Sequence, residues 1–357
     1  MQDLPLYKSD EQRFYATLTE RVNAYFTDKG ISKYATTAWY VRAVLMVSLF
    51  CATVVAIYLQ WFNNYVNLAL CFLAGLLMAG IGLAISHQAS HNTISEKQWV
   101  NRLWSLSFNL VGVSDYIWHI KHDVFHHAYT NIYAYDEALK EGDILRFSTD
   151  APLKKMHRFQ HVYAVLIYGV FTIFWIFILD FEKLFRYRRN GIGKERHHSL
   201  AEHLIFWTTK IYYVAVFVYL PLVIGYEWWQ VLIGHLVMHA VAGTIVTHAL
   251  QVEHLNEKTI MIPYQPKEKQ EMSWAENQLV GTANFAIKNP LLNWYIAGVN
   301  LQIEHHLFQY INAAHYENLA PIVRQTAEEF NYPYVEFSGI GEAVRSHYRF
   351  LKRLGRN

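Results

Sequence analysis

The chain has 357 residues, a formal net charge of +2, and 53% hydrophobic and 16% aromatic side chains. Its length alone allows a soluble two-domain enzyme, but the apolar residues gather in long runs, which argues against a soluble protein. The small net charge identifies no partner, and we expect none among nucleic acids.

Four apolar runs are each about long enough to cross a hydrocarbon layer ~30 Å thick. They cover residues 41–62, 66–86, 205–226 and 228–250. In a soluble protein each run would need a helix that is buried on every side, so a membrane explains four of them better. We therefore predict an all-α membrane protein with four transmembrane helices.

Residues 1–38 form a polar lead-in to the first run. Their apolar side chains Phe14, Leu18, Val22 and Tyr25 recur at helical spacing. This spacing predicts an amphipathic surface helix that lies against the bilayer or against the catalytic part of the protein.

The placement of charge predicts the orientation in the membrane. The short connections after the first and third runs carry no Lys or Arg, whereas the termini and the long loops carry many. By the positive-inside rule, the termini and long loops lie in the cytoplasm. Residues 162–181 are also apolar but have basic residues on both flanks, so we expect them to lie in the membrane interface without crossing. Residues 39–357 then form a single domain.

Histidine is unusually frequent, with 19 residues in the chain. His87 and His91 come at the end of the second run, about one helical turn apart, so both imidazoles can face one point. Further histidines lie in three other segments, as His122, His126 and His127, then His248 and His254, then His305 and His306. The predicted crossings bring all four segments to the same side and depth of the membrane.

Such a set of imidazoles suits iron, copper, zinc or nickel, and it exceeds what one octahedral ion can use. We therefore predict a cytoplasmic, histidine-rich cap that holds two metal ions. Two redox-active irons could bind O2 and oxidise an unactivated methylene, whereas zinc would imply hydrolysis. Candidates for carboxylates that orient the imidazoles are Asp123, Asp136, Glu253 and Glu304. Position alone does not choose between His248 and His254.

Three of these segments resemble the histidine boxes of the membrane fatty acid desaturase family, in the branch related to bacterial front-end desaturases. They are residues 87–92 (HQASHN), residues 112–132 around the second cluster, and residues 300–308 (NLQIEHHLF). Two positions depart from the usual boxes, since Gln88 replaces an Asp and Gln309 replaces a Pro. Neither change removes a ligand.

The resemblance implies a ligand set for two irons. The ligands would be His87, His91, His122, His126, His127, His254, His305 and His306. His254 is favoured over His248 because the family has an extra ligand histidine just beyond its last span. Gln302 replaces the first histidine of the third box, as in front-end enzymes, and is expected to be a weak ligand or an outer partner. Asp123 and Glu304 remain possible ligands or orienting groups.

The implied activity is O2-dependent insertion of a cis double bond into a long fatty acyl chain, carried on CoA or on a glycerolipid. The acyl tail would enter a narrow apolar tunnel between the spans. No cytochrome b5 motif occurs, so electrons would come from a separate ferredoxin or cytochrome b5-like protein with its reductase. The expected location is the bacterial inner membrane, with the active site in the cytoplasm.

A basic cytoplasmic surface is expected to hold a phosphate headgroup, CoA or an acidic electron carrier. Its residues are Lys121, Lys154, Lys155, Arg186, Arg188 and Arg189. The nearest alternative function is a hydroxylase or ketolase on the same scaffold, acting on an acyl chain, an alkane or a carotenoid. A zinc hydrolase or a non-enzymatic, metal-sensing membrane protein is the alternative from another class.

Overall fold

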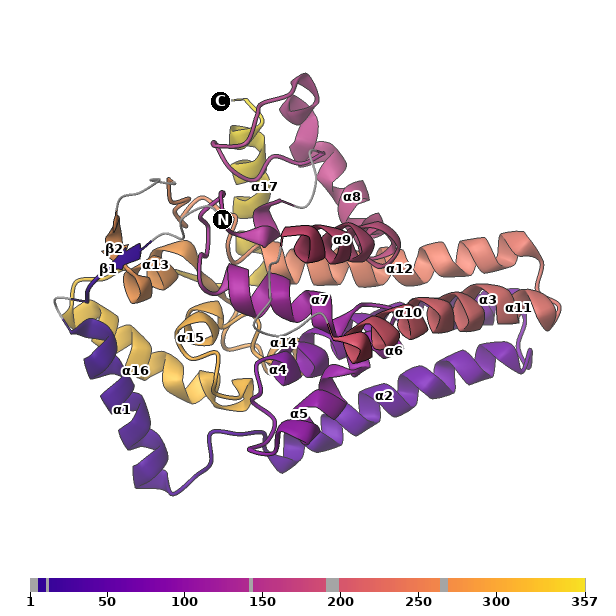
Figure 1. The fold of residues 1–357 in the computed structure, drawn as a ribbon, viewed down its shortest axis with the longest axis horizontal. Helices are drawn as coiled ribbons and strands as arrows, with labels where there is room; N and C mark the ends of the chain where they lie inside the picture. Colours follow the sequence, from indigo (N-terminus) through magenta and orange to yellow (C-terminus); the bar gives the residue numbers. More distant parts are fainter. Residues whose placement is uncertain (1–5, 11–12, 141–143, 191–198, 264–268, 357) are drawn as a thin grey trace.

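The computed structural model describes residues 6–10, 13–140, 144–190, 199–263 and 269–356, and these ranges are mostly helical (Figure 1). The α-helices are α1 (Phe14–Lys29), α2 (Thr37–Tyr58), α3 (Asn64–Gly80), α4 (His87–Ser90), α5 (Gln98–Ser105), α6 (Ser107–Leu110), α7 (Asp115–His119), α8 (Gln160–Phe174), α9 (Asp180–Asn190), α10 (Leu200–Val214), α11 (Leu220–Val223), α12 (Trp228–Gln251), α13 (Trp274–Gly281), α14 (Pro290–Ile296), α15 (Gln302–Leu307), α16 (Tyr316–Glu329) and α17 (Ile340–Leu354). Short strands β1 (Leu6–Lys8) and β2 (Lys269–Ser273) pair in parallel, as do β3 (Asn284–Phe285) and β4 (Glu336–Phe337).

The long helices α2, α3, α10 and α12, with the short α11, make up one end of the molecule, which we call the stem. Figure 1 shows them running along the long axis, and α3 packs against both α2 and α12. The contact between α3 and α12 requires Gly75, because a Cβ there would lie 2.4 Å from the carbonyl oxygen of Met238. Side chains such as Val41 and Leu45 stay exposed on the stem, as a lipid-facing surface requires.

Within the described residues, five helices are long and apolar enough to cross a membrane. They are Thr37–Tyr58, Asn64–Ser90, Lys155–Arg189, Leu200–Val223 and Trp228–Gln251. Four of them correspond to the predicted spans, with ends shifted by a few residues. The remaining one contains the segment that we predicted to be interfacial, and length and composition do not distinguish it from a span. The number of crossings therefore stays a prediction.

At the other end of the molecule, α1, α13, α15 and α16 gather with the β1–β2 pair into a cap (Figure 1). Phe14, Leu18 and Val22 of α1 are fully buried against α16 and its neighbours. The amphipathic lead-in therefore packs on the protein, although parts of the predicted segment, residues 1–5 and 11–12, lie outside the described residues. The short helices α4 and α7, which carry or precede the first two histidine clusters, lie between stem and cap (Figure 1).

Candidate metal centre

The second histidine cluster depends on a local change of helix type. After α7 the chain continues as a π-helix, Ile120–His126, and the amide of His127 donates to the carbonyl oxygen of His122 over 3.1 Å, five residues back. In this winding, residues five apart share a face, so the Nε2 atoms of His122 and His127 come within 3.1 Å. The ring of His126 also stacks on that of His122, with centroids 5.2 Å apart, but its Nε2 lies 3.2 Å from Nε2 of His254.

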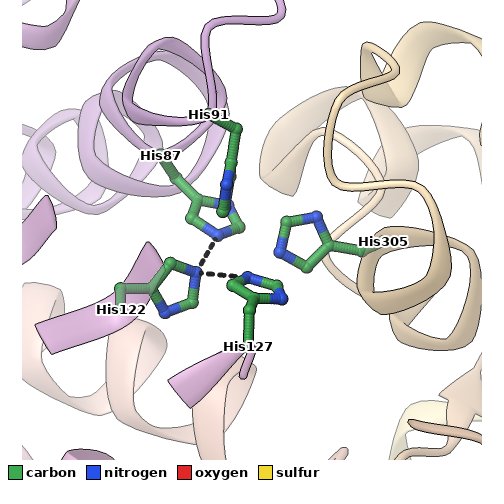
Figure 2. Close-up of side chains that lie close together, drawn as sticks. All are labelled: His87, His91, His122, His127 and His305. Carbon is green, nitrogen blue, oxygen red and sulfur yellow. Dashed lines mark hydrogen bonds between the residues drawn. The ribbon is translucent and has the colours of Figure 1, made fainter. Parts of the chain in front are cut away.

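A first group of five histidines converges from three segments, as Figure 2 shows. It contains His87, His91, His122, His127 and His305, and one ring nitrogen of each lies within 4.8 Å of the others. The closest pair is His87 and His122, whose Nε2 atoms are 2.7 Å apart. The members of the group lie at the end of the second stem helix, in or directly after the π-helix, and in α15.

A second group of three histidines lies beside the first. His126, His254 and His306 also bring one ring nitrogen each within 4.8 Å of the others. The rings of His127 and His306, one from each group, have centroids 4.3 Å apart. The two groups are therefore neighbours, and each is large enough to hold one ion.

The outer nitrogens of the second group determine where the lone pairs point. Nδ1 of His254 lies 3.1 Å from the carbonyl oxygen of Gly281, which only accepts, so this nitrogen carries the proton. Nδ1 of His126 likewise donates to the Asp136 carboxylate over 3.0 Å. Nδ1 of His306 has the amide oxygen of Gln278 at 2.8 Å. In each neutral ring the lone pair then sits on Nε2 and points into the group.

In the first group, His305 shows the same orientation. Tyr316 donates its hydroxyl to the carbonyl oxygen of Ile311 and accepts from Nδ1 of His305 at 3.3 Å. Nε2 of His305 and Nε2 of His91 are buried and have no hydrogen-bond partner in the described chain. Converging lone pairs repel one another unless a cation lies between them, so the donor set fits metal ions.

Burial favours the neutral rings that metal binding needs. It lowers the pKa of His122, His127, His305 and His306 well below the ordinary value, and neighbouring histidines add to the effect. Burial also lowers the pKa of His254 to about 3. For His91 burial outweighs the opposing Asp123 carboxylate, and the pKa falls. These rings stay unprotonated, and thus able to ligate, at neutral pH.

Residues 63–338 match the family model described as "Fatty acid desaturase". The chain belongs to this family. Among curated proteins, the desaturase is 29% identical to the sn-1 linoleoyl-lipid 6-desaturase of Arthrospira platensis, over 96% of its own length and 93% of that protein. It is 28% identical to the enzyme of the same name from Synechocystis sp., over 98% and 97% of the two chains. An acyl-lipid (8-3)-desaturase of Physcomitrium patens is 27% identical, over 97% of this chain and 72% of the moss protein.

The remaining predicted site residues of the desaturase lie close to the two groups or apart from them. Gln302 is close, with its amide nitrogen 3.0 Å from Nε2 of His254. Asp123 also contacts the first group, since it pairs with His119 and lies 3.4 Å from Nδ1 of His91. His248 belongs to neither group, because it is bonded to the carbonyl oxygen of Thr244 and to the Tyr348 hydroxyl.

Glu304 is a correction to the sequence analysis. Although it precedes His305, its carboxylate accepts from Asn284 at 2.7 Å and from Tyr334 at 2.9 Å, on the side of α15 away from the imidazoles. Burial raises its pKa to about 7, against the effect of these two hydrogen bonds. Its side-chain hydrogen bonds in the described chain therefore go to Asn284 of β3 and to Tyr334, and not to the metal-ligand candidates.

Lys121 is a second correction. It was expected on a basic surface, but it is only 7% exposed and lies over the rings of Trp118 and Trp175. The π-helix turns its side chain inward. Arg186 is half-buried and paired with Glu137. The other predicted surface residues are exposed, namely Lys154, Lys155, Arg188 and Arg189.

Several residues that hold the imidazoles were missed by sequence reasoning. They are the Gly281 carbonyl, Gln278, Tyr316 and Trp118, which stacks on His122 with ring centroids 4.4 Å apart. Of the carboxylates that were expected to orient imidazoles, Asp136 and Asp123 do contact a histidine of the two groups. A backbone acceptor cannot be recognised from residue type, because every residue has a carbonyl group. Gln278 lies 28 residues from His306, the histidine that it contacts.

Proposed function

We propose that this desaturase inserts a cis double bond near the carboxyl end of a long acyl chain of a glycerolipid, using O2 and two irons. The observation that carries the proposal is the pair of adjacent, buried histidine groups beside an apolar cavity between the stem helices. The printed names of the relatives, linoleoyl-lipid and acyl-lipid desaturases, support a lipid-linked substrate.

The two groups would each hold one iron. Bound there, the irons would supply the redox chemistry that reduces O2 and takes hydrogen from an unactivated methylene. The chain contributes neutral, pre-aimed imidazoles and a dry environment: His87, His127 and His305 are each 1% exposed. A mostly imidazole shell adds little negative charge, so the metals keep more of their positive charge.

The acyl tail would run from the histidines into the stem. A cavity of about 30 Å³ connects His87 with Met78, Trp118 and Val246. A larger cavity of about 430 Å³ follows in the same direction, lined by Ala74 among others. Thirteen residues separate this alanine from His87, a distance of about 20 Å at the helical rise of ~1.5 Å per residue. The narrow part must widen when a tail enters.

The geometry of the histidine groups also supports four crossings. His127 and His254 lie in adjoining groups, so the chain between them must cross the membrane an even number of times. Three candidate helices lie in that interval: Lys155–Arg189, Leu200–Val223 and Trp228–Gln251. One of them therefore does not cross. We infer that it is the first, because α8 runs obliquely across the direction of the stem in Figure 1 and basic residues flank it.

This topology places both termini and both histidine groups in the cytoplasm, as expected for a bacterial inner-membrane enzyme. The exposed Lys154, Lys155, Arg188 and Arg189 would then face lipid headgroups or an acidic electron donor. A separate ferredoxin or cytochrome b5-like protein with its reductase would supply the electrons. Cysteine accessibility tests the orientation: a cysteine at Arg188 should be labelled only from the cytoplasm, and one at Tyr65 only from outside.

The activity is tested by expressing the chain in a host and analysing its lipids by gas chromatography and mass spectrometry. A new cis double bond in glycerolipid acyl chains is the expected result. An oxygenated product without a new double bond would favour the hydroxylase or ketolase alternative. Metal analysis of the purified protein tests the alternative of a zinc hydrolase or a non-enzymatic protein. Zinc without iron would favour the hydrolase.

A further inference from the structure

The two histidine groups differ in the number of protein ligands that they offer. The first group has five histidines, and the second has only His126, His254 and His306. Two polar groups near the second have unmet bonding capacity in the described chain: the amide oxygen of Gln302 and the carboxylate of Glu253. Gln302 occupies a histidine position of the third box, whereas Glu253 was expected only to orient an imidazole and bonds to none in the described chain.

Glu253 is in an unusual position for a carboxylate. It lies two residues beyond the end of α12, its side chain is 0% exposed, and neither of its oxygens has a hydrogen-bond partner among the described residues. The other buried carboxylates beside the groups are satisfied: Asp136 accepts from His126 and from the Asn131 amide. A charged carboxylate that is buried without a partner is unfavourable, and a nearby cation or hydrogen-bond donors reduce that cost. Burial accordingly raises the pKa of Glu253 well above its ordinary value.

The cavity beside Glu253 leads to the second group. Glu253, His126, His254 and Gln302 line a cavity of about 30 Å³, which is enough for at least one water molecule. The nearer oxygen of Glu253 lies 4.0 Å from Nε2 of His254. The Glu253 oxygens are nevertheless not within 4.8 Å of the ligand nitrogens of all three histidines. Ligation therefore requires the flexible side chain to rotate into the cavity.

We propose that Glu253 is an oxygen ligand of the metal ion held by His126, His254 and His306. The inference rests on the proposed two-metal function. Imidazoles with one carboxylate are a familiar iron ligand set. The carboxylate would give the second ion one negative ligand, whereas the first ion has only neutral ones. The two ions are then inequivalent, and the second is easier to oxidise.

The test compares the metal content of purified Glu253→Gln and Glu304→Gln with that of the wild type. Both glutamates are buried and precede a histidine, but Glu304 is bonded away from the groups. We expect Glu304→Gln to keep both irons and Glu253→Gln to keep only that of the five-histidine group, which also shows that the variant is folded. Two retained irons in Glu253→Gln would overturn the proposal.

A second measurement uses the unaltered, iron-loaded protein and does not depend on a variant's folding. Anomalous diffraction at the iron edge locates both ions. An oxygen of Glu253 within about 2.2 Å of the second ion supports ligation, and a longer distance rejects it, even where Glu253→Gln has lost both irons by unfolding. Wild-type protein that takes up no iron at all would instead contradict the proposed function.

Discussion

The Nε2 atoms of His87 and His122 lie 2.7 Å apart, although 35 residues separate them along the chain. Neither atom has a hydrogen to share if both rings present their lone pairs, so the contact is repulsive without a cation. The same holds for His126 and His254 at 3.2 Å. The folded chain therefore brings together groups whose repulsion a bound metal relieves.

Metal removal should for this reason destabilise the desaturase. A ligand that binds only the folded state stabilises it by about 4 kcal/mol at roughly 1,000 times its dissociation constant. We expect chelation to lower the melting temperature in detergent and added iron(II) to restore it. His248→Ala, altered outside both groups, should show the same response to metal. Equal melting temperatures with and without metal would contradict this prediction.

Replacing His254 should have a far larger effect than replacing His248. His254 is one of only three histidines in the second group, and His248 bonds only to Thr244 and Tyr348. We expect His254→Ala to lose one iron and at least 100-fold in activity, because ligand loss should exceed the ~10- to 100-fold effect of losing an outer partner. His248→Ala should keep both irons. The reverse order of effects would show that the histidines have been assigned to the wrong roles.

Asp136 orients a ligand candidate, and its loss should weaken metal binding. It accepts from Nδ1 of His126 and from two backbone amides. An asparagine there removes the negative charge that raises the basicity of the ring, so we expect Asp136→Asn to lose about 10- to 100-fold in metal affinity. Asp115→Asn is the control, because Asp115 is also buried but pairs with Arg102. Competition with a fluorescent chelator measures both affinities.

Glu137 should make stability depend on acidic pH. Burial would raise its pKa, but Lys183 and Arg186 outweigh burial and lower the pKa from 4.5 to about 2. Because the pKa is lower in the folded state, the stabilisation is complete above about pH 4.5 and is lost as pH falls toward 2. It amounts to about 3 kcal/mol at most. The melting temperatures of wild type and Glu137→Gln should converge as the pH falls from about 5 toward 2. A constant difference would refute the pairing.

Sequence reasoning located the histidines and the apolar segments because hydropathy and residue type are local properties. It could not divide the histidines between two ions. That division depends on which ring nitrogens meet in the folded chain: Nε2 of His127 meets that of His122, whereas Nε2 of His126 meets that of His254, 128 residues away. Nor could it separate Lys155–Arg189 from a span, since its length and composition fit both readings. Tyr316 was missed because only the fold of α15 and α16 brings it to His305.

The cavity that begins at His87 should limit the length of the acyl tail. Met78 and Val246 line it, and it holds only about 30 Å³. A bulkier Val246→Phe should exclude long tails, and Met78→Ala should admit longer ones. One methylene in an apolar pocket changes discrimination by about 10- to 200-fold. The ratio of kcat/KM between long and short acyl chains should therefore shift at least tenfold, and in opposite directions in the two variants.

Leu236→Phe is the matched control for these two variants. It adds a ring to the same helix as Val246, α12, at a position that is 43% exposed and does not line the cavity. Truncating a core methionine costs about 2–5 kcal/mol, so total activity falls in Met78→Ala for reasons unrelated to fit. The ratio of kcat/KM between two chain lengths does not depend on that loss, because the same fraction of folded enzyme acts on both substrates. Active variants with unchanged ratios would place the tail elsewhere.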